Sequence, residues 1–171
     1  MSDWENLLAE HGPDMYRAAC RILGRADEAE DCVQDVFLEI IGRSGACDVD
    51  HWAAVLKWMV TVRSLDRLRR RRTRREVGPA GLADVPSRRP DAAGRHSADE
   101  MVAWLRSAIT ELPSRRSQVF TLRYFADMSY DEIARAVGIE VNAVGVLLYE
   151  ARRQLRTRIP AEWVENWGMK R

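Results

Sequence analysis

The spacing of apolar residues divides the first part of the chain into helical segments. In residues 4–24 and 26–43 apolar side chains recur every three or four positions, as expected for one buried face of a helix. Residues 51–75 begin in the same way and end as a run of arginines. Gly12 and Pro13 indicate either a kink or a new start within the first segment. We therefore predict three helices here, with a buried face that includes Leu7, Leu8, Met15, Ala19, Ile22, Leu23, Cys32, Val33, Val36, Phe37, Ile40, Ile41, Trp52, Val55, Leu56, Met59 and Val62.

The hydrophobic pattern stops in the middle of the chain and then resumes. Residues 76–98 contain several prolines and glycines and show no period, which is typical of a flexible linker. Four more amphipathic segments follow, and the first places Met101, Val102, Leu105, Ile109 and Leu112 on one face. This pattern predicts an all-α protein with two small helical domains, 1–75 and 99–159, and a C-terminal tail, 160–171.

The last two of these segments have the sequence signals of a helix-turn-helix. Ser129 and Glu132 have the spacing of a capping box, and Gly138 suits the left-handed end of a short helix. A second helix from about Asn142 places Val144, Leu148, Ala151 and Leu155 at buried positions. A capped helix, a short turn with glycine and a second amphipathic helix form this motif.

Composition narrows the classes of protein. The 171 residues are 46% hydrophobic, which suits modest cores, and no apolar run approaches the length of a membrane span. The first residues are acidic, unlike a signal peptide, so we expect a cytoplasmic protein with no membrane contact. Cys20, Cys32 and Cys47 lie far apart without a metal-ligand spacing, and we expect reduced thiols, no metal and no cofactor.

The net charge of +1 hides a strong asymmetry. Residues 1–50 contain four basic and twelve acidic side chains, a balance of −8, whereas residues 51–75 contain nine basic and one acidic, a balance of +8. The first stretch therefore favours a basic partner and the second an acidic one, such as nucleic acid.

The order of these blocks resembles the extracytoplasmic-function (ECF) group of bacterial sigma factors over nearly the whole chain. The stretch "ADEAEDCVQDVFLEII" is similar to the family helix that grips the clamp coiled coil of RNA polymerase. The stretch "LKWMVTVRSLDRLRRRR" resembles the helix that opens and reads the minus-10 promoter element. "ITELPSRRSQVFTLRYFADMSYDEIARAVGI" resembles segment 4, which binds the minus-35 element. The resemblance implies a non-enzymatic initiation factor that binds core polymerase, at its clamp coiled coil and flap, and promoter DNA, with an anti-sigma factor as a further candidate partner.

The resemblance also implies the residues of each surface. For core polymerase they are Asp31, Gln34, Asp35, Leu38 and Glu39. For minus-10 DNA they are Trp58, Arg63, Ser64, Asp66, Arg67, Arg69, Arg70 and Arg71, where Trp58 is a candidate for stacking on a flipped base because it lies off the stripe of Val55, Met59 and Val62. Trp52 is expected to pack in the core.

Two departures from the family pattern change the expected DNA contacts. Val62 stands where the family usually has an asparagine, four residues before Asp66, so one polar minus-10 contact is expected to be lost. The expected minus-35 residues lack most of the usual hydroxyl and cationic readers and are Arg115, Arg116, Arg123, Asn142, Ala143, Val146, Tyr149, Arg152 and Arg153.

Three interpretations of the exposed Ala143, Val146 and Leu147 remain open. They contact thymine methyl groups while arginines hold phosphates, or they form an apolar patch for a protein partner, or they have no role. The tail, with Trp163, Val164 and Trp167, is also a candidate to cover this face.

Two further functions compete with the sigma factor. One is a sigma-like adaptor that has weakened minus-35 recognition and acts through protein contacts. The other is an all-α, Mg²⁺-dependent nucleotide pyrophosphohydrolase, for which Glu28, Asp31 and Asp35 have suitable helical spacing. No second carboxylate pair is evident on a facing helix, so we expect no such enzyme.

Overall fold

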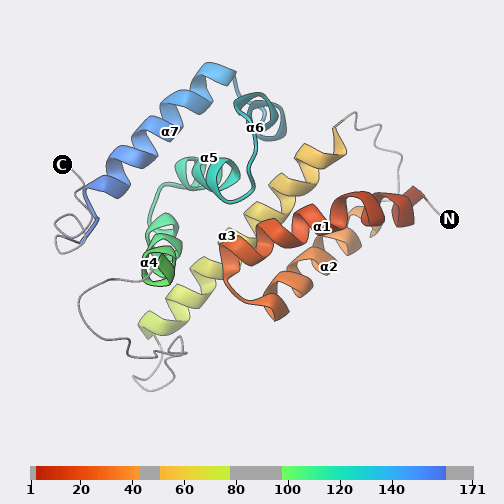
Figure 1. Cartoon of the computed structure of the whole chain (residues 1–171), viewed down its shortest axis with the longest axis horizontal. Helices are drawn as coiled ribbons and strands as arrows, with labels where there is room; N and C mark the ends of the chain where they lie inside the picture. The colour runs from red at the N-terminus through yellow and green to blue at the C-terminus, as the bar shows by residue number, and fades with distance from the viewer. Residues whose placement is uncertain (1–2, 43–50, 78–97, 161–171) are drawn as a thin grey trace.

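The computed structural model describes residues 3–42, 51–77 and 98–160. These residues form seven α-helices, and no strand occurs among them, so the predicted all-α fold is confirmed (Figure 1). None of the described helices combines the length and the apolar character that a bilayer crossing requires. The helices are α1 (Asp3–Leu23), α2 (Ala26–Gly42), α3 (Trp52–Val77), α4 (Ala98–Thr110), α5 (Ser114–Tyr124), α6 (Tyr130–Val137) and α7 (Val141–Arg156). Most of the predicted linker lies outside the described residues, which include only its first two residues, at the end of α3, and its last residue, at the start of α4. Of the predicted tail, only Pro160 is described.

The N-terminal half consists of α1, α2 and the first part of α3, which pack against one another around a shared core. Helix α1 is a single helix that passes through Pro13, so neither a break nor a new start occurs there. Met15, Ile22, Val36 and Leu56 are fully buried in this core. Helices α1 and α2 therefore each bury one stripe, as the periodicity predicts.

Helix α3 crosses between the two halves of the chain. It packs against α1 and α2 and also against α4, α5 and α6, and Figure 1 shows it lying between the two groups. Its buried side chains accordingly surround more of the helix than one stripe and continue into the arginine run: they are Ala54, Leu56, Val60, Thr61, Ser64, Leu65 and Leu68. Helix α3 is therefore part of the core as far as Leu68, whereas Thr73, Arg74 and Arg75 near its end are exposed.

In the C-terminal half, α5, α6 and α7 pack against one another and, through α3, continue the same core. Val119, Phe120 and Leu122 of α5 and Phe125 at its C-terminal cap are buried, as are the residues predicted for α7. Ser129 and Glu132 form the predicted capping box, and Gly138 ends α6 at a φ of 70°. The helix-turn-helix prediction is confirmed in its local geometry.

Several predicted buried positions are wrong at the edges of helices. Leu8, Ile41 and Val102 are exposed, and Val55, Met59 and Val62 are only half-buried. Of these, Met59 still packs partly against the core. Trp52 is partly buried against the core, as expected.

Polar contacts join the two halves near the end of α1. Arg106 of α4 donates to the carbonyl oxygen of Arg21 at 3.0 Å, and the Arg21 side chain pairs with Asp127. Arg72 of α3 lies 2.8 Å from Glu111, which also pairs with Arg158. Burial and the nearby Arg71 charge lower the pKa of the Arg106 guanidinium. Arginines that bind carboxylates and helix-end carbonyls thus supply the polar part of this interface.

Gly24 allows this contact because it ends α1 in the left-handed region, at a φ of 73°. A Cβ atom there would lie 2.7 Å from Nη1 of Arg106. We predict that Gly24→Ala lowers the free energy of unfolding by about 1–2 kcal/mol, because a side chain at positive φ is strained and Arg106 must move. Urea denaturation measures this loss.

Gly42→Ala is the matched control, because a Cβ atom at Gly42 meets nothing within 4 Å in the part of the chain that the structure describes. Its stability should be unchanged or slightly raised, as for an ordinary helical glycine. Equal losses in the two variants would contradict the role assigned to Gly24.

Candidate polymerase and nucleic-acid interfaces

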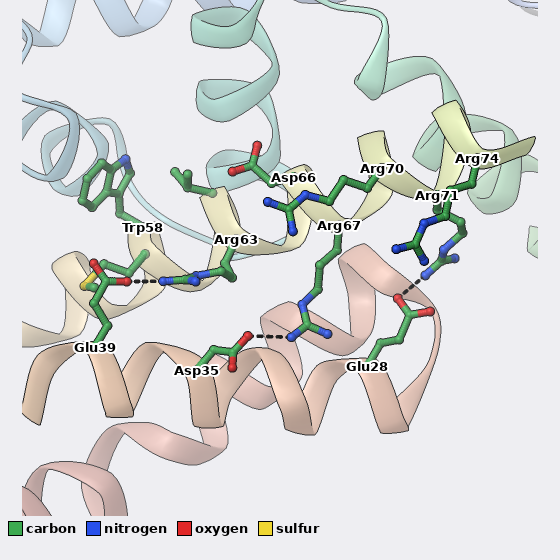
Figure 2. Close-up of a pocket in the computed structure, with 12 residues that line it drawn as sticks. Glu28, Asp35, Glu39, Trp58, Arg63, Asp66, Arg67, Arg70, Arg71 and Arg74 are labelled. Carbon is green, nitrogen blue, oxygen red and sulfur yellow. Dashed lines mark hydrogen bonds and ion pairs between the residues drawn. The ribbon is translucent and has the colours of Figure 1, made fainter. Parts of the chain in front are cut away.

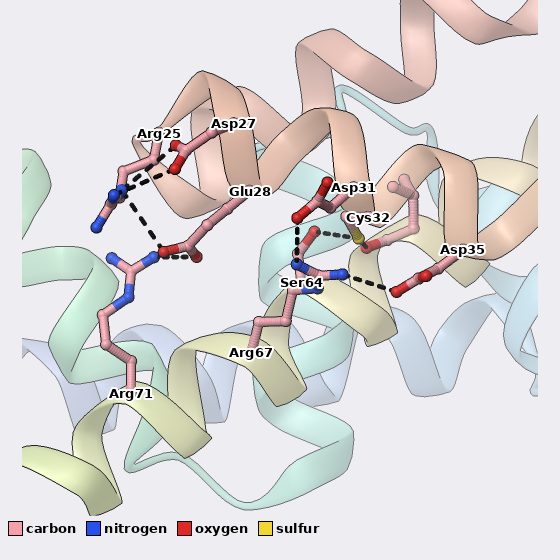
Figure 3. Close-up of polar contacts among 10 residues, drawn as sticks. Arg25, Asp27, Glu28, Asp31, Cys32, Asp35, Ser64, Arg67 and Arg71 are labelled. Carbon is pink, nitrogen blue, oxygen red and sulfur yellow. Dashed lines mark hydrogen bonds and ion pairs between the residues drawn. The ribbon is translucent and has the colours of Figure 1, made fainter.

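Carboxylates of α2 face arginines of α3 along a row that we call the acid–arginine row. It consists of Glu28, Asp31, Asp35 and Glu39 on α2 and of Arg63, Arg67 and Arg71 on α3 (Figures 2 and 3). Both sets repeat every three or four residues, so each occupies one side of its helix. The helices run in opposite directions, since pairs that are late in α2 are early in α3.

The pairs of the acid–arginine row are close and partly buried. Arg67 lies 2.7 Å from Asp35 and 3.9 Å from Asp31, while Arg63 pairs with Glu39 and Arg71 with Glu28. Burial opposes the charge on Arg67, but the hydrogen bond to Asp35 and the nearby carboxylates outweigh it and raise the pKa of the guanidinium. The pairing therefore stabilises the charged forms of the arginines and of the carboxylates.

Under the row, Cys32 and Ser64 join the two helices. Their side-chain atoms Sγ and Oγ lie 3.5 Å apart, and both residues are fully buried. Burial raises the pKa of the Cys32 thiol. This confirms the prediction of a core thiol for Cys32, and Cys20 also packs against the core, whereas Cys47 lies outside the described residues. Ser64, predicted to bind DNA, is instead buried between helices.

A groove of about 670 Å³ runs beside the acid–arginine row. Its lining includes Trp58, Met59, Val62, Asp66, Arg70 and Arg74. Figure 2 shows Trp58 near one end of this lining and Arg74 near the other. Trp58 thus lies on the same side as Met59 and Val62, contrary to the prediction that it lies off their stripe. Its Nε1 atom is buried and has no hydrogen-bond partner among the described residues. An unpaired donor of this kind is unfavourable by about 1–3 kcal/mol unless an acceptor binds.

The remaining predicted residues on α2 and α3 are divided between exposed and paired positions. On α2, Gln34 and Leu38 are exposed, with 68% of Leu38 accessible to solvent. On α3, Arg69 lies 3.5 Å from Asp66. Arg70 is exposed and makes no ion pair among the described residues. The structure therefore brings the predicted polymerase-binding acids and the predicted DNA-binding arginines into one surface.

This shared surface was missed by the sequence interpretation, although a signal for it exists. Arg63, Arg67 and Arg71 are four residues apart, and so are Asp31, Asp35 and Glu39. Two helices with such complementary rows favour pairing with each other. The pairing also places an arginine beside each carboxylate that the pyrophosphohydrolase alternative would need. Among the described residues there is no cluster of acidic, histidine or cysteine side chains suited to a metal ion.

Helix α7 presents a face that differs from the predicted one. Val146 and Tyr149 are 58% and 62% exposed, whereas Ala143 and Leu147 are half-buried. Asn142, Arg152 and Arg153 are exposed on the same helix. The most exposed apolar side chains of α7 are therefore Val146 and Tyr149, and Val141 at its first position is 39% exposed.

Three of the arginines predicted to bind minus-35 DNA instead contact other residues of the C-terminal half. Arg116 pairs with Glu150 at 2.8 Å and also approaches Gln154. Arg123 donates to the carbonyl oxygen of Met128 and lies over the ring of Tyr130. Arg115, although exposed, donates to the carbonyl oxygen of Val137 at 3.4 Å. These contacts hold the helix-turn-helix together.

Each half of the chain matches a known family model. Residues 7–74 match the model of Sigma-70 region 2, and residues 103–155 match the model of Sigma-70 region 4. The chain belongs to the ECF group of the sigma-70 family. The acid–arginine row lies within region 2 of this family member, and the helix-turn-helix lies within region 4.

Individual relatives agree with this assignment. The ECF RNA polymerase sigma factor SigE of Mycolicibacterium smegmatis is 28% identical over 91% of this chain, and the chain spans 61% of its length. The RNA polymerase sigma factor SigV of Bacillus subtilis is 27% identical over 91% of the chain and 90% of its own length. A chain in the solved structure of CnrH in complex with the cytosolic domain of CnrY has a similar fold, with a TM-score of 0.57 and 22% identity. The match covers 91% of this chain and 86% of that chain.

The capping box that orients the helix-turn-helix gives a prediction on pH. The backbone N–H of Ser129 donates to Glu132 at 2.7 Å, and this bond is the main reason that the pKa of Glu132 is lowered. The carboxylate therefore stabilises the fold above its unfolded-state pKa of about 4.3, and this contribution is lost as the pH falls through the lower folded-state value. We predict that Glu132→Gln is less stable at pH 7 by about 0.5–1 kcal/mol and that the deficit shrinks below about pH 4.

Thermal or urea unfolding between pH 3 and pH 7 measures this deficit, at roughly one-unit steps. Glu140→Gln is the matched control, because Glu140 precedes α7 and its side chain makes no capping hydrogen bond. A deficit for Glu132→Gln that does not change with pH would contradict the assigned role of its carboxylate.

Proposed function

We propose that this chain is a promoter-specificity subunit, which binds core RNA polymerase through α2 and promoter DNA through α3 and α7. The observation that carries the proposal is the match of both sigma-70 regions, in order, to one chain. The structure supplies a surface suited to each contact. The protein catalyses no step in this proposal, and its contribution is to position polymerase and DNA.

The polymerase contact would centre on Leu38. This side chain is 68% exposed and has Gln34, Asp35 and Glu39 as neighbours on α2. An apolar centre surrounded by acidic groups suits a basic coiled coil, such as the polymerase clamp, through apolar burial and charge complementarity. In the same proposal the C-terminal half binds the polymerase flap.

The minus-10 contact would lie along the groove beside the acid–arginine row. Arg70 and Arg74 are exposed there and can neutralise phosphates, and the unpaired Nε1 of Trp58 offers a donor to a base or phosphate. The arginines of the acid–arginine row would bind phosphates most strongly when their carboxylate partners bind another group. These arginines are Arg63, Arg67 and Arg71.

The minus-35 contact would distinguish DNA sequences only weakly. Asn142, Arg152 and Arg153 are the exposed polar residues of α7 that remain from the predicted set, and Arg116 and Arg123 are held internally. Val146 and Tyr149 can contact thymine methyl groups. The adaptor remains the second candidate, since the same two exposed side chains also suit a protein partner.

An anti-sigma factor is a further proposed partner. The structure of CnrH, which has a similar fold, was solved in complex with the cytosolic domain of CnrY. The exposed apolar residues on α2 and α7 are surfaces on which such a partner can bind.

Transcription in vitro tests the proposed function. Core polymerase is supplied with this protein on a random-promoter library, and the dependent transcripts are sequenced. We predict enrichment of a minus-10 motif, with a weaker upstream motif. The variant Leu38→Ser should reduce both transcription and the affinity for core polymerase by about tenfold, as for a central interface residue.

Leu8→Ser is the matched control, because Leu8 is a leucine on α1 that is 47% exposed and lies outside the proposed contact. It should transcribe like the unchanged protein. Enrichment of a minus-10 motif alone would indicate that the C-terminal half contacts proteins and not DNA. The absence of dependent transcripts would favour the adaptor.

The acid–arginine row gives a separate prediction for DNA binding by the free protein. Asp35→Asn removes the closest partner of Arg67. We predict that its affinity for a minus-10 single strand rises about two- to fivefold, the value of a partly exposed ion pair. The salt dependence should also steepen, because one more phosphate is neutralised.

Glu30→Gln controls for the change in net charge, since Glu30 is exposed on α2 and outside the acid–arginine row. Fluorescence anisotropy at several salt concentrations compares the two variants. The same gain in both would show that overall charge, and not the pairing with Arg67, limits DNA binding.

A further inference from the structure

The exposed side of α7 changes in character from its beginning to its end. Val146 and Tyr149 lie three residues apart, so their side chains are neighbours on the helix surface. Arg152 and Arg153 follow one turn later on the same side and are exposed. An apolar patch is thus continued by a basic one along a single helix.

A groove lies at the C-terminal end of this surface. Tyr149, Arg152, Arg153 and Arg156 line it from α7, and Thr157 and Ile159 line it from the segment that leaves the helix. The chain therefore passes the edge of the groove immediately before residue 161.

Residues 161–171 have a composition that matches this surface. Trp163, Val164 and Trp167 are apolar and lie within five positions, and Glu162 and Glu165 are the acidic residues beside them. Lys170 and Arg171 follow beyond this acidic and aromatic part. Aromatic side chains can cover Val146 and Tyr149, and the two carboxylates can pair with arginines of α7.

The segment is also long enough and close enough. In an extended form its eleven residues span roughly 36 Å at about 3.3 Å per residue. The path back from Pro160 to Val146 follows about 14 residues, or roughly 20 Å of helix. Because the segment is tethered at the groove, its effective concentration there is of the order of millimolar.

We propose that residues 161–171 dock on the exposed face of α7, with Trp163 and Trp167 covering Tyr149 and Val146 and with Glu162 and Glu165 facing the arginines. The docking itself requires no partner. Its consequence rests on the proposed function: the docked segment occupies the face that minus-35 DNA would contact, so it and DNA exclude each other.

Fluorine NMR of the intact chain tests the docking without DNA. The six tryptophans are replaced with 5-fluorotryptophan, and the signals of the tail are assigned with Trp163→Phe and Trp167→Phe. The reference is a synthetic peptide of residues 161–171. We expect both tail signals to be displaced from their positions in the peptide.

The displacement should depend on both sides of the contact. Tyr149→Ser, and separately Glu162→Lys with Glu165→Lys, should move the signals most of the way back to the peptide positions. Leu8→Ser, which removes an exposed leucine from α1, should leave them displaced. Added salt should reduce the displacement, because the charged part of the contact is screened.

Three outcomes would overturn the proposal. Tail signals that coincide with those of the peptide would show that the segment does not dock. A displacement that persists in Tyr149→Ser and Val146→Ser would place it elsewhere, and one that vanishes on dilution would show binding to a second copy.

The failure of this inference is distinguishable from the failure of the proposed function. Peptide-like signals together with promoter-dependent transcription would remove the docking and keep the sigma factor. Displaced, Tyr149-dependent signals without any dependent transcript would keep the docking and remove the promoter function.

Discussion

Neutralisation of α3 by α2 is the interaction on which the rest of the structure depends. Residues 51–75 contain nine basic side chains, and a helix with this charge does not pack closely against other helices unless its repulsion is offset. The carboxylates of α2 provide this offset at Arg63, Arg67 and Arg71. Leu65 and Leu68, which lie between these arginines in the sequence, can therefore be buried. Helix α3 thereby serves both halves of the molecule.

The same pairing links the two surfaces of the proposed function. Carboxylates that face arginines are weaker partners for a basic coiled coil, and the arginines are weaker partners for phosphate, because each charge is already partly compensated. A polymerase surface that binds Asp35 and Glu39 would release Arg67 and Arg63 toward the groove. Binding at one surface then favours binding at the other, as linkage between coupled sites requires.

The sequence predicts well those features that depend on a single helix and its nearest neighbour. The capping box of Ser129 and Glu132 and the buried stripe of α7 follow from local spacing alone. The buried residues of α3 do not, because that helix contacts neighbours on more than one side and a single amphipathic stripe no longer describes it. The acid–arginine row was missed for a related reason: its two charge patterns were interpreted separately, each with an external partner, although their spacings match each other.

The number of basic residues in each half therefore overstates the number of cations that are available to bind DNA phosphates. In the C-terminal half, Arg116 and Arg123 hold a carboxylate and a carbonyl, and their loss to phosphate binding follows from the packing that orients α7. On α7 itself the exposed cations are concentrated near the end of the helix, after Tyr149, whereas Val146 and Tyr149 before them are apolar. A helix with this distribution holds phosphate better than it distinguishes bases, since charge positions a duplex and polar contacts to base edges specify it. Sequence preference in this protein would then arise mainly at the groove of α3, where a tryptophan and arginines lie together.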